Sequence, residues 1–375
     1  MRVGLMDEAT LEGLIVARYD RGTCRFAGGG DYPVTGVLDH AVDAGPLLRH
    51  GRELGEARGV RFYDGHAVLG HAASTGRTRV RVASAHGSFD VTARVMVDAR
   101  GAASPYAAAD LVCPTVGGVL EGLAEGDAPD EVDPRVGDIL VTVDGVGEDG
   151  RQHVWEGFPG RAGETTVYLF YYARAAEPVS LGELYARFFD TLGTYKRGQA
   201  RLLRPTFGFI PGWSRLSAPP ASPDPRVVLV GDAAARHSPL TYCGFGATLR
   251  SLERAADRVE ALATEVLPPG ARSTAMDDAP VHALTGALAR MMATRALGGD
   301  ALNQLLDAAF ATLHEMGSVP YAQLLRDEMS PRDFVTFLRR TASRHPEVWR
   351  KVMRGLGPWA AGVWGTNVAR SLMSP

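Results

Sequence analysis

The arrangement of apolar and polar positions predicts a change of structure along the first hundred residues. Residues 7–18 predict a helix that opens with acidic side chains, where the helix dipole favours negative charge, and residues 43–57 predict a second helix. Residues 59–97 contain short runs of alternating apolar and polar residues, separated by turn residues. This stretch predicts a small antiparallel sheet followed by a buried strand.

The rest of the chain divides into a β-rich part and a helical part. Residues 112–174 predict further strands with Gly- and Asp-rich connections, and residues 180–192 predict a helix. After a breaker-rich linker at 221–225, the run RVVLVGDA predicts a fully buried strand. From about residue 245 the pattern is mainly helical, with breaks at 267–270 and near Pro320, Pro331 and Pro346. The order of elements predicts a mixed α/β protein.

Composition excludes several functional classes. The 375 residues carry a net charge of −3, without the basic excess of a general nucleic-acid binder. Three cysteines, none in a CxxC pair, give no disulfide framework and fit a reducing cytoplasm. No uninterrupted apolar run is long enough to span a bilayer, and the N-terminus lacks the pattern of a signal peptide. HxxxH, HExxH and GxSxG spacings are absent, so no metal site or serine hydrolase is predicted.

The strongest local signal lies in residues 226–260. The predicted buried strand ends at Gly231 and Asp232, and ligands of open α/β sheets bind at the carboxyl ends of strands. Pro239 and the Gly244-Phe245-Gly246 turn then open a long amphipathic helix. Glycine permits close approach of the backbone to a ligand, and a helix N-terminus supplies free N–H groups and partial positive charge. This pattern predicts the binding of an anionic or carbonyl-bearing cofactor edge.

These residues also carry a resemblance to a known family. The run GDAAARHSPLTYCGFGATLR resembles the second FAD-contacting motif of the p-hydroxybenzoate-hydroxylase-like flavoproteins, in the form found in FAD-dependent lycopene cyclases and geranylgeranyl reductases. VMVDARGAASP at 95–105 resembles the strand and turn before the substrate domain of that superfamily, and WEGFPG at 155–160 resembles a segment of the cyclases. The resemblance covers roughly residues 5–260. It implies FAD as cofactor and the FAD-binding glutathione-reductase/p-hydroxybenzoate-hydroxylase-like fold.

The resemblance has one clear departure. The family opens with a strand, GxGxxG and a helix that bind the ADP pyrophosphate, and this sequence has no such opening. The literal match from Gly145 to Gly150 lies between two predicted strands and opens no helix, so we interpret it as a chance match. The expectation is therefore that the start codon is placed too late or that the ADP half-site is lost, with the first favoured.

The resemblance implies four parts and a set of site residues. The parts are a partial FAD-binding domain at 1–105, a β-rich substrate domain at 106–222, a return to the FAD-binding domain at 223–265 and a helical region at 266–375. Lycopene cyclisation needs an acid that stays protonated in an apolar setting, and Glu156, next to Trp155 and Phe158, is the candidate. Asp98 is expected either to position the flavin or to cap a turn, and Arg100 either to contact flavin or phosphate or to lie at the surface.

Two side chains and one tail leave alternatives open. His237 and Cys243 lie near the cofactor motif, but structural roles are favoured for both. Residues 345–372 combine tryptophans with basic residues at helical spacing, which suits either a helix packed on the domain or a peripheral contact with the inner face of the membrane.

The expected function is cyclisation of an isoprenoid or carotenoid end group in the cytoplasm or at the membrane surface. A redox alternative is an FAD-dependent reductase or monooxygenase that acts on a hydrophobic substrate. A flavin-free accessory or lipid-binding protein is the alternative outside enzymology.

Overall fold

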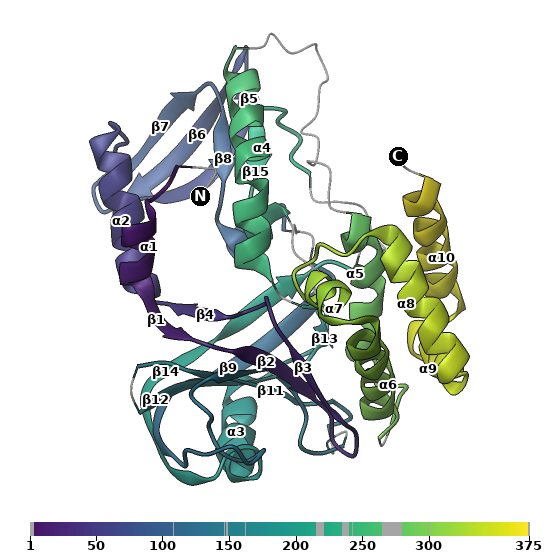
Figure 1. The fold of residues 1–375 in the computed structure, drawn as a ribbon. Coiled ribbons are helices and arrows are strands. Elements are labelled where there is room, and N and C mark those ends of the chain that lie inside the picture. The colour runs from purple at the N-terminus through teal and green to yellow at the C-terminus, as the bar shows by residue number, and fades with distance from the viewer. Residues whose placement is uncertain are drawn as a thin grey trace.

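The computed structural model describes residues 4–107, 109–145, 147, 149–161, 163–214, 221–234, 240–241, 243–264, 280–298 and 300–373. These residues form three neighbouring parts: a large β-sheet, a smaller α/β part above it and a group of helices at the side (Figure 1). The candidate residues Pro239 and His237, and the predicted break at 267–270, lie outside the described residues.

The large sheet has the order β13-β9-β12-β11-β10-β2-β3, and β14 also pairs with β9. Most pairs are antiparallel, but β10 and β2 are parallel. The strands are β2 Arg21–Arg25, β3 Asp31–Val34, β9 Leu111–Leu123, β10 Val136–Val141, β11 Val154–Pro159, β12 Glu164–Phe170, β13 Ala173–Arg174 and β14 Gly198–Gly212.

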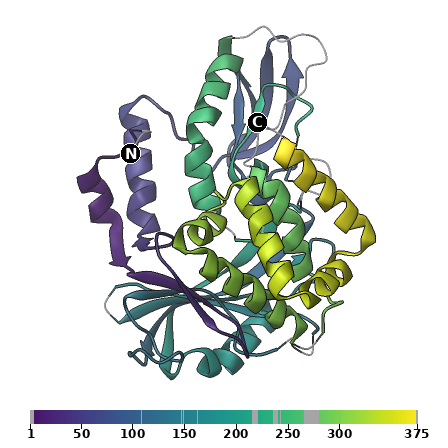
Figure 2. The ribbon, with the colours of Figure 1, turned by 45° about the vertical axis from the view of Figure 1, so that its right-hand side comes forward.

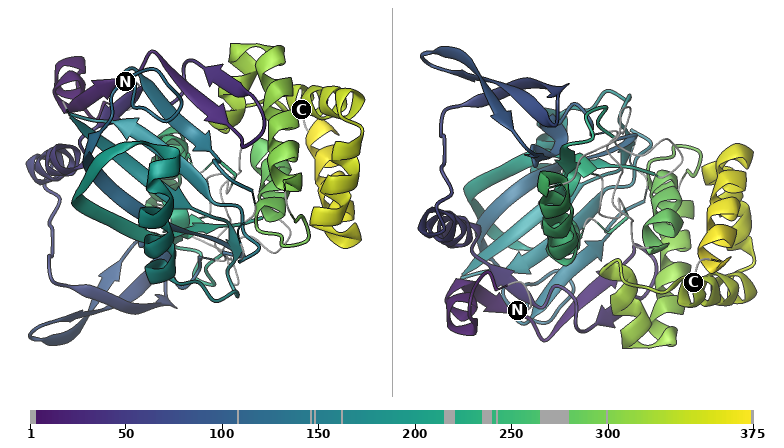
Figure 3. Two further views of the ribbon diagram at one scale, coloured as in Figure 1. Left: turned by 90° about the horizontal axis from the view of Figure 1, so that it is seen from below. Right: turned by 90° about the horizontal axis from the view of Figure 1, so that it is seen from above.

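One face of the large sheet is covered by helix α3, Leu181–Tyr195 (Figure 3). The helix begins at the N-cap Ser180, whose side chain accepts a hydrogen bond from the Glu183 N–H. Its buried positions recur at helical spacing, so one apolar stripe faces the strands. Trp155 of β11 stacks on Tyr195 with ring centroids 4.7 Å apart. Because side chains alternate along a strand, Glu156 points to the opposite face.

The smaller α/β part contains the predicted cofactor strand. Strand β15, Val227–Leu229, pairs in parallel with β8, Met96–Asp98, and a three-stranded antiparallel sheet follows the order β5-β6-β7. A 3-10 turn, η2 Gly231–Ala234, follows β15, and helix α4, Gly244–Thr264, runs alongside (Figure 1). The other elements are α1 Glu8–Leu14, β1 Ile15–Arg18, β4 His40–Val42, α2 Ala44–Ala57, β5 Ala67–Ser74, β6 Arg77–Ser84, β7 Gly87–Ala93 and the 3-10 turn η1 Gly101–Ala103.

Helices α5 to α10 pack together against the edge of the large sheet and its open face (Figures 1 and 2). They are α5 Pro280–Met292, α6 Ala301–Met316, α7 Ser318–Leu325, α8 Pro331–Arg344, α9 Glu347–Leu356 and α10 Pro358–Met373. Pro331 occupies the start of α8 and Pro346 is the N-cap of α9, as the predicted breaks require. No helix in the described ranges is long and apolar enough to cross a membrane.

The mixed α/β fold class is confirmed, with corrections to single elements. The predicted helix at 7–18 ends at Leu14, because Ile15 to Arg18 pair as a strand with β4. Strands β2 and β3 were not predicted, and they extend the large sheet although they precede residue 105. The boundaries of the four predicted parts are not tested by this arrangement and stay a prediction.

Candidate functional site

A cavity of about 650 Å³ lies between the open face of the large sheet and the start of helix α4. We call it the site cavity. Its floor consists of residues from β9, β11 and β12. Residues of β14 form one side, and the first turn of α4 forms the roof. The lining of the cavity includes Cys113, Thr115, Glu156, Phe158, Tyr168, Phe170, Phe207, Phe209, Thr241, Cys243, Phe245, Gly246, Arg250 and Arg326.

Glu156 is the acidic residue of this lining. It pairs with Tyr168 across β11 and β12, so the carboxyl and the phenol lie side by side on the floor. Among the described residues, no hydrogen bond or ion pair reaches the Glu156 carboxyl. Its side chain is partly accessible from the cavity, yet it lies deep within the protein, and this burial raises the pKa of the carboxyl to about 8. Glu156 is therefore a neutral acid near pH 7.

The cavity exposes aromatic side chains that a folded protein ordinarily buries. Phe207 and Phe245 are each 65% exposed, and Phe209 is 48% exposed. All three line the same cavity, so their exposure forms one continuous apolar surface. Contiguous exposed apolar surface is typical of binding sites, whereas isolated exposed residues are ordinary.

The start of α4 is held in place by contacts to the last residue of α7 and to the segment that follows it. The Cys243 thiol donates to the Leu325 carbonyl at 2.6 Å, and the Thr241 hydroxyl donates to Asp327 at 3.0 Å. The first intrahelical bond runs from the Ala247 N–H to the Cys243 carbonyl at 3.0 Å. The N–H groups at the start of the helix precede that bond, and they are available to a ligand in the way helix N-termini allow.

Two arginines place positive charge at the rim of the cavity, and the sequence analysis missed both. Arg250 donates to the Arg326 carbonyl at 2.6 Å, and both guanidinium groups lie near Glu328, at 3.5 and 3.0 Å. Arg250 lies four residues after Gly246 and therefore one helical turn away on the same face. That spacing could have identified Arg250, whereas Arg326 reaches the site only through the tertiary fold.

The remaining predicted cofactor residues form a second cluster at the carboxyl ends of β8 and β15. Asp98 is buried and accepts hydrogen bonds from Arg100 Nε at 2.9 Å, Arg100 Nη2 at 2.7 Å and the Ser104 hydroxyl at 2.8 Å. Burial opposes ionisation, but these hydrogen bonds outweigh it and lower the pKa of Asp98. These hydrogen bonds tie Asp98 to the turn that contains Arg100 and Ser104.

Asp232 lies next to that turn. A side chain at Gly101 would come within 3.9 Å of the Asp232 side chain, and both Gly101 and Gly231 have a positive φ, of 60° and 58°. The two turns therefore face each other. Among the predicted site residues, the structure brings Glu156, Phe245 and Gly246 together in the site cavity, and Gly244 is the first residue of α4. It brings Asp98, Arg100, Gly231 and Asp232 together in the second cluster. Their roles in binding a cofactor stay predictions.

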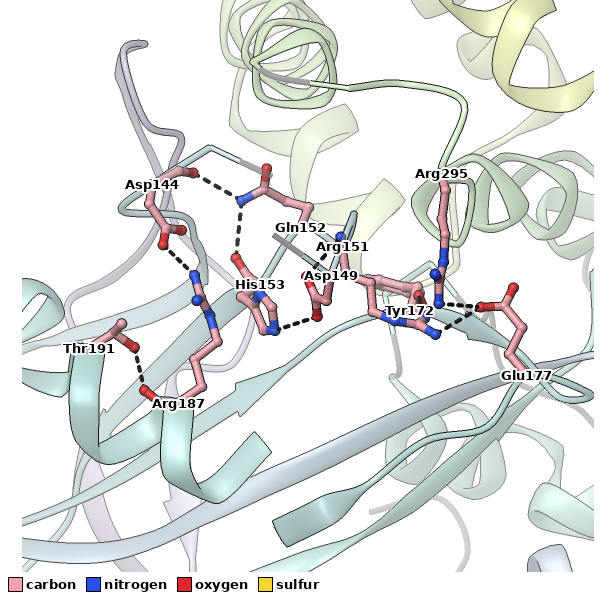
Figure 4. Close-up of polar contacts among 10 residues, drawn as sticks. All are labelled: Asp144, Asp149, Arg151, Gln152, His153, Tyr172, Glu177, Arg187, Thr191 and Arg295. Carbon is pink, nitrogen blue, oxygen red and sulfur yellow. Dashed lines mark hydrogen bonds and ion pairs between the residues drawn. The ribbon is translucent and has the colours of Figure 1, made fainter. Parts of the chain in front are cut away.

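The literal GxGxxG lies in the connection between β10 and β11, and no helix follows it. A Cβ at Gly147 would come within 2.9 Å of Asp149 and within 3.6 Å of His153 and Arg187, and Gly150 has a φ of 73°. This connection belongs to a polar network at the far end of β11 (Figure 4). Arg187 pairs with Asp144 at 2.7 Å, and Arg151 pairs with Glu177 at 2.8 Å. The glycines therefore serve a strand connection.

The C-terminal tail packs on the domain along most of its apolar face. Val348, Val352 and Trp364 are buried in the core that the helices share with the large sheet. Trp359 is 63% exposed, with Met353 also exposed. The predicted membrane contact of this tail is untested and stays a prediction. Within the described residues, no group of three metal-binding side chains comes together.

This architecture, with a β-sheet below a cavity and a Gly-Asp strand and helix above it, is that of the flavin-dependent halogenases and monooxygenases of the p-hydroxybenzoate-hydroxylase type. The flavin-dependent halogenase CmlS aligns with 99% of this chain and 68% of its own, at 16% identity and a TM-score of 0.53. The halogenase PltM, in complex with phloroglucinol and FAD, aligns with 96% of this chain and 80% of its own, at 11% identity and a TM-score of 0.56.

The p-nitrophenol 4-monooxygenase PnpA from Pseudomonas putida DLL-E4 aligns with 88% of this chain and 83% of its own, at 13% identity and a TM-score of 0.52. No family model and no curated protein matches the sequence. Identities this low establish the shared fold. The expected fold is confirmed, and the cyclase subgroup stays a prediction.

Proposed function

We propose that this chain is an FAD-dependent enzyme that acts on a hydrophobic molecule in the site cavity, with Glu156 as the acid. The observation that carries the proposal is a carboxyl with a pKa of about 8 on the floor of an aromatic cavity, opposite a helix N-terminus. A neutral carboxylic acid in this position can donate a proton, and few other roles explain its burial without a partner.

The residues present fit a flavin. The cavity volume of about 650 Å³ and its aromatic walls suit a flat ring system, and Gly246 leaves the backbone of the first turn of α4 open to close approach. Solved structures of the similar halogenase PltM contain FAD. The start of α4 would hold the ring edge, and the second cluster around Asp98 and Asp232 would meet the more polar part of the cofactor. A reduced flavin would supply negative charge or reducing equivalents to the cavity.

The finer proposal is proton-initiated cyclisation of an isoprenoid or carotenoid end group. Glu156 donates its proton to a terminal alkene, the resulting cation closes a ring, and the Glu156 carboxylate takes up the proton that the ring loses, so the reaction is a net isomerisation. Phe158, Tyr168 and Phe170 lie on the same floor and present aromatic rings that stabilise positive charge. The lining offers little water to compete for the cation, because its surface is mostly apolar.

The direct test is Glu156→Gln. Reconstituted protein is assayed anaerobically with reduced FAD and lycopene, and we expect the variant to lose roughly 10²–10⁴-fold in turnover, the usual contribution of a positioned acid. Flavin content should not change. Glu164→Gln on β12 is the matched control, because Glu164 forms a partly exposed pair with Arg204 outside the cavity. Full activity of Glu156→Gln would end the proposal.

A second candidate is an FAD-dependent oxidoreductase, a reductase or monooxygenase, with the same hydrophobic substrate class. It is supported by the similarity of the fold to halogenases and monooxygenases. Consumption of NAD(P)H or oxygen with loss of double bonds or insertion of oxygen would establish it. Ring formation without consumption of a reductant would establish the cyclase.

A flavin-free accessory role is the alternative outside enzymology. A purified protein that stays colourless and takes up no added FAD would favour it.

We also propose a cytoplasmic protein whose exposed Trp359 contacts the inner membrane surface. Trp359→Ala should then weaken sedimentation with anionic vesicles.

A further inference from the structure

A second, smaller cavity of about 70 Å³ lies in the core between the large sheet and the C-terminal helices. We call it the inner chamber. Its walls include Val154 from β11, Met291 and Met292 from α5, and Ala309 from α6. None of the described residues that line it is charged. The helices therefore do not close tightly onto this part of the sheet.

The inner chamber lies directly beyond Glu156. Val154 and Glu156 are two residues apart on β11 and point to the same face, so their side chains stand about 7 Å from each other. The next strand, β12, repeats this arrangement: Phe170 at its end lines the site cavity, and Tyr172, two residues further along the chain, lines the chamber. Thr241 lines both cavities, which places one side chain at the boundary between them.

The size and chemistry of the chamber restrict what can enter it. An engineered apolar cavity of about 150 Å³ binds benzene and stays dry, so a chamber near half that volume suits a group of about three to five carbon atoms. Apart from the Tyr172 and Thr241 hydroxyls, which donate to the Leu240 carbonyl and to Asp327, the lining side chains are apolar, so a polar group would lose most of its hydration. The two methionines have flexible side chains that adapt to a branched guest.

We infer that the inner chamber is a binding subsite for the short branched hydrocarbon terminus of the molecule held in the site cavity. A chain bound along the aromatic surface of Phe207, Phe209 and Phe245 would pass Glu156 and end beyond it. A terminal isopropylidene group seated in the chamber places its double bond next to the carboxyl. The inference deepens the proposed function and rests on it for the identity of the long chain, but the subsite itself can be tested without turnover.

The test uses the intact chain labelled with ¹³C at the methionine methyl groups. We titrate it with 2-methylbut-2-ene and follow the signals of Met291 and Met292. In the wild type we expect both to shift and saturate. Ala309→Leu fills the chamber and should abolish the response, whereas Ala311→Leu, the same change two residues along α6 and outside the lining, should keep it.

A second filling variant, Leu288→Phe from α5, guards against a folding defect in Ala309→Leu, and thermal unfolding confirms that each variant is folded. Saturable shifts in the wild type that either folded filling variant abolishes support the inference. Absence of shifts in the wild type, or equal shifts in folded filled and unfilled variants, overturns it.

A kinetic measurement with lycopene separates this inference from the proposed function. Filling the chamber should lower kcat/KM for lycopene about tenfold or more, the usual effect of a misplaced methylene-sized group. Unchanged kcat/KM in a folded filled variant would overturn the placement of the terminus in the chamber. If the wild type binds 2-methylbut-2-ene but does not convert lycopene, the subsite stands and the proposed function fails.

Discussion

Residues 151–156, which run from the connection before β11 to the middle of that strand, contain two buried polar groups in opposite states. At the start of this segment, Arg151 is buried and paired with Glu177 (Figure 4), and its guanidinium lies 4.5 Å from the Tyr171 ring. At the other end, five residues away, Glu156 has no described partner and faces an apolar cavity. A buried ion usually needs a partner, so a buried acid without one is kept neutral. The difference marks the Arg151 end as structural and the Glu156 end as available for chemistry.

The largest stability effect should come from the paired end. Arg151→Met leaves Glu177 with only the longer contact to Arg295 at 3.4 Å, and we expect a loss of about 3 kcal/mol in the free energy of unfolding. The control is Arg135→Met, because the Arg135 side chain is 67% exposed, and its loss should change stability by less than about 1 kcal/mol. Urea unfolding at neutral pH measures both. Equal losses of unfolding free energy in Arg151→Met and Arg135→Met would show that the buried pair stabilises the protein no more than the surface pair.

Glu156, the unpaired group, should make the free energy of unfolding fall as the pH rises. The pKa of Glu156 is about 8 in the folded protein and near 4.5 when unfolded, so the native state holds the proton more tightly. The stabilising contribution is fully present below pH 4.5 and is lost as the pH rises through 8. We expect wild type to lose a few kcal/mol relative to Glu156→Gln between pH 5 and pH 9. Parallel stability curves for the two proteins would show that the carboxyl is solvated.

His153 should change stability with the opposite sign, in a pH window that overlaps that of Glu156. Burial, with Arg187 adding repulsion, lowers the pKa of His153 to about 4, below its ordinary value of 6.5. The imidazole therefore stays neutral in the folded protein while the unfolded chain takes up a proton. Stability is fully present above pH 6.5 and is lost as the pH falls through 4. His153→Gln should flatten this acid limb by about 2 kcal/mol. Glu156→Gln should steepen it, because the opposing loss of stability from Glu156 begins near pH 4.5 and is removed in this variant. If His153→Gln keeps the acid limb of the wild type, groups other than His153 cause the loss of stability at acid pH.

The same contrast explains which features the sequence predicts. Glu156 could be predicted as a candidate from the sequence, because WEGFPG contains its aromatic neighbours and the strand alternation that buries it. Helix α2 was predicted within one residue, since Asp43 caps it locally. The parallel pairing of β10 with β2 joins segments more than 100 residues apart, and no local pattern encodes that pairing. The network of Arg151, His153 and Arg187 likewise depends on α3 and the connection before β11 meeting in space.

Tyr168→Phe should have the smallest effect and would show what sets the acidity of Glu156. Burial is the cause of the raised pKa, and the phenol of Tyr168 is a neighbour whose own pKa is raised by burial and by Glu156. Removing the hydroxyl keeps the ring and the desolvation, so kcat/KM should still fall above pH 8 and stability should change by less than about 1 kcal/mol. The pH dependence of kcat/KM and of urea unfolding in this variant measures both expectations. A shift of the alkaline limb by a full pH unit would mean that a hydrogen bond from Tyr168 governs the acid, and Glu156 would then belong with the partnered groups at the other end of the strand.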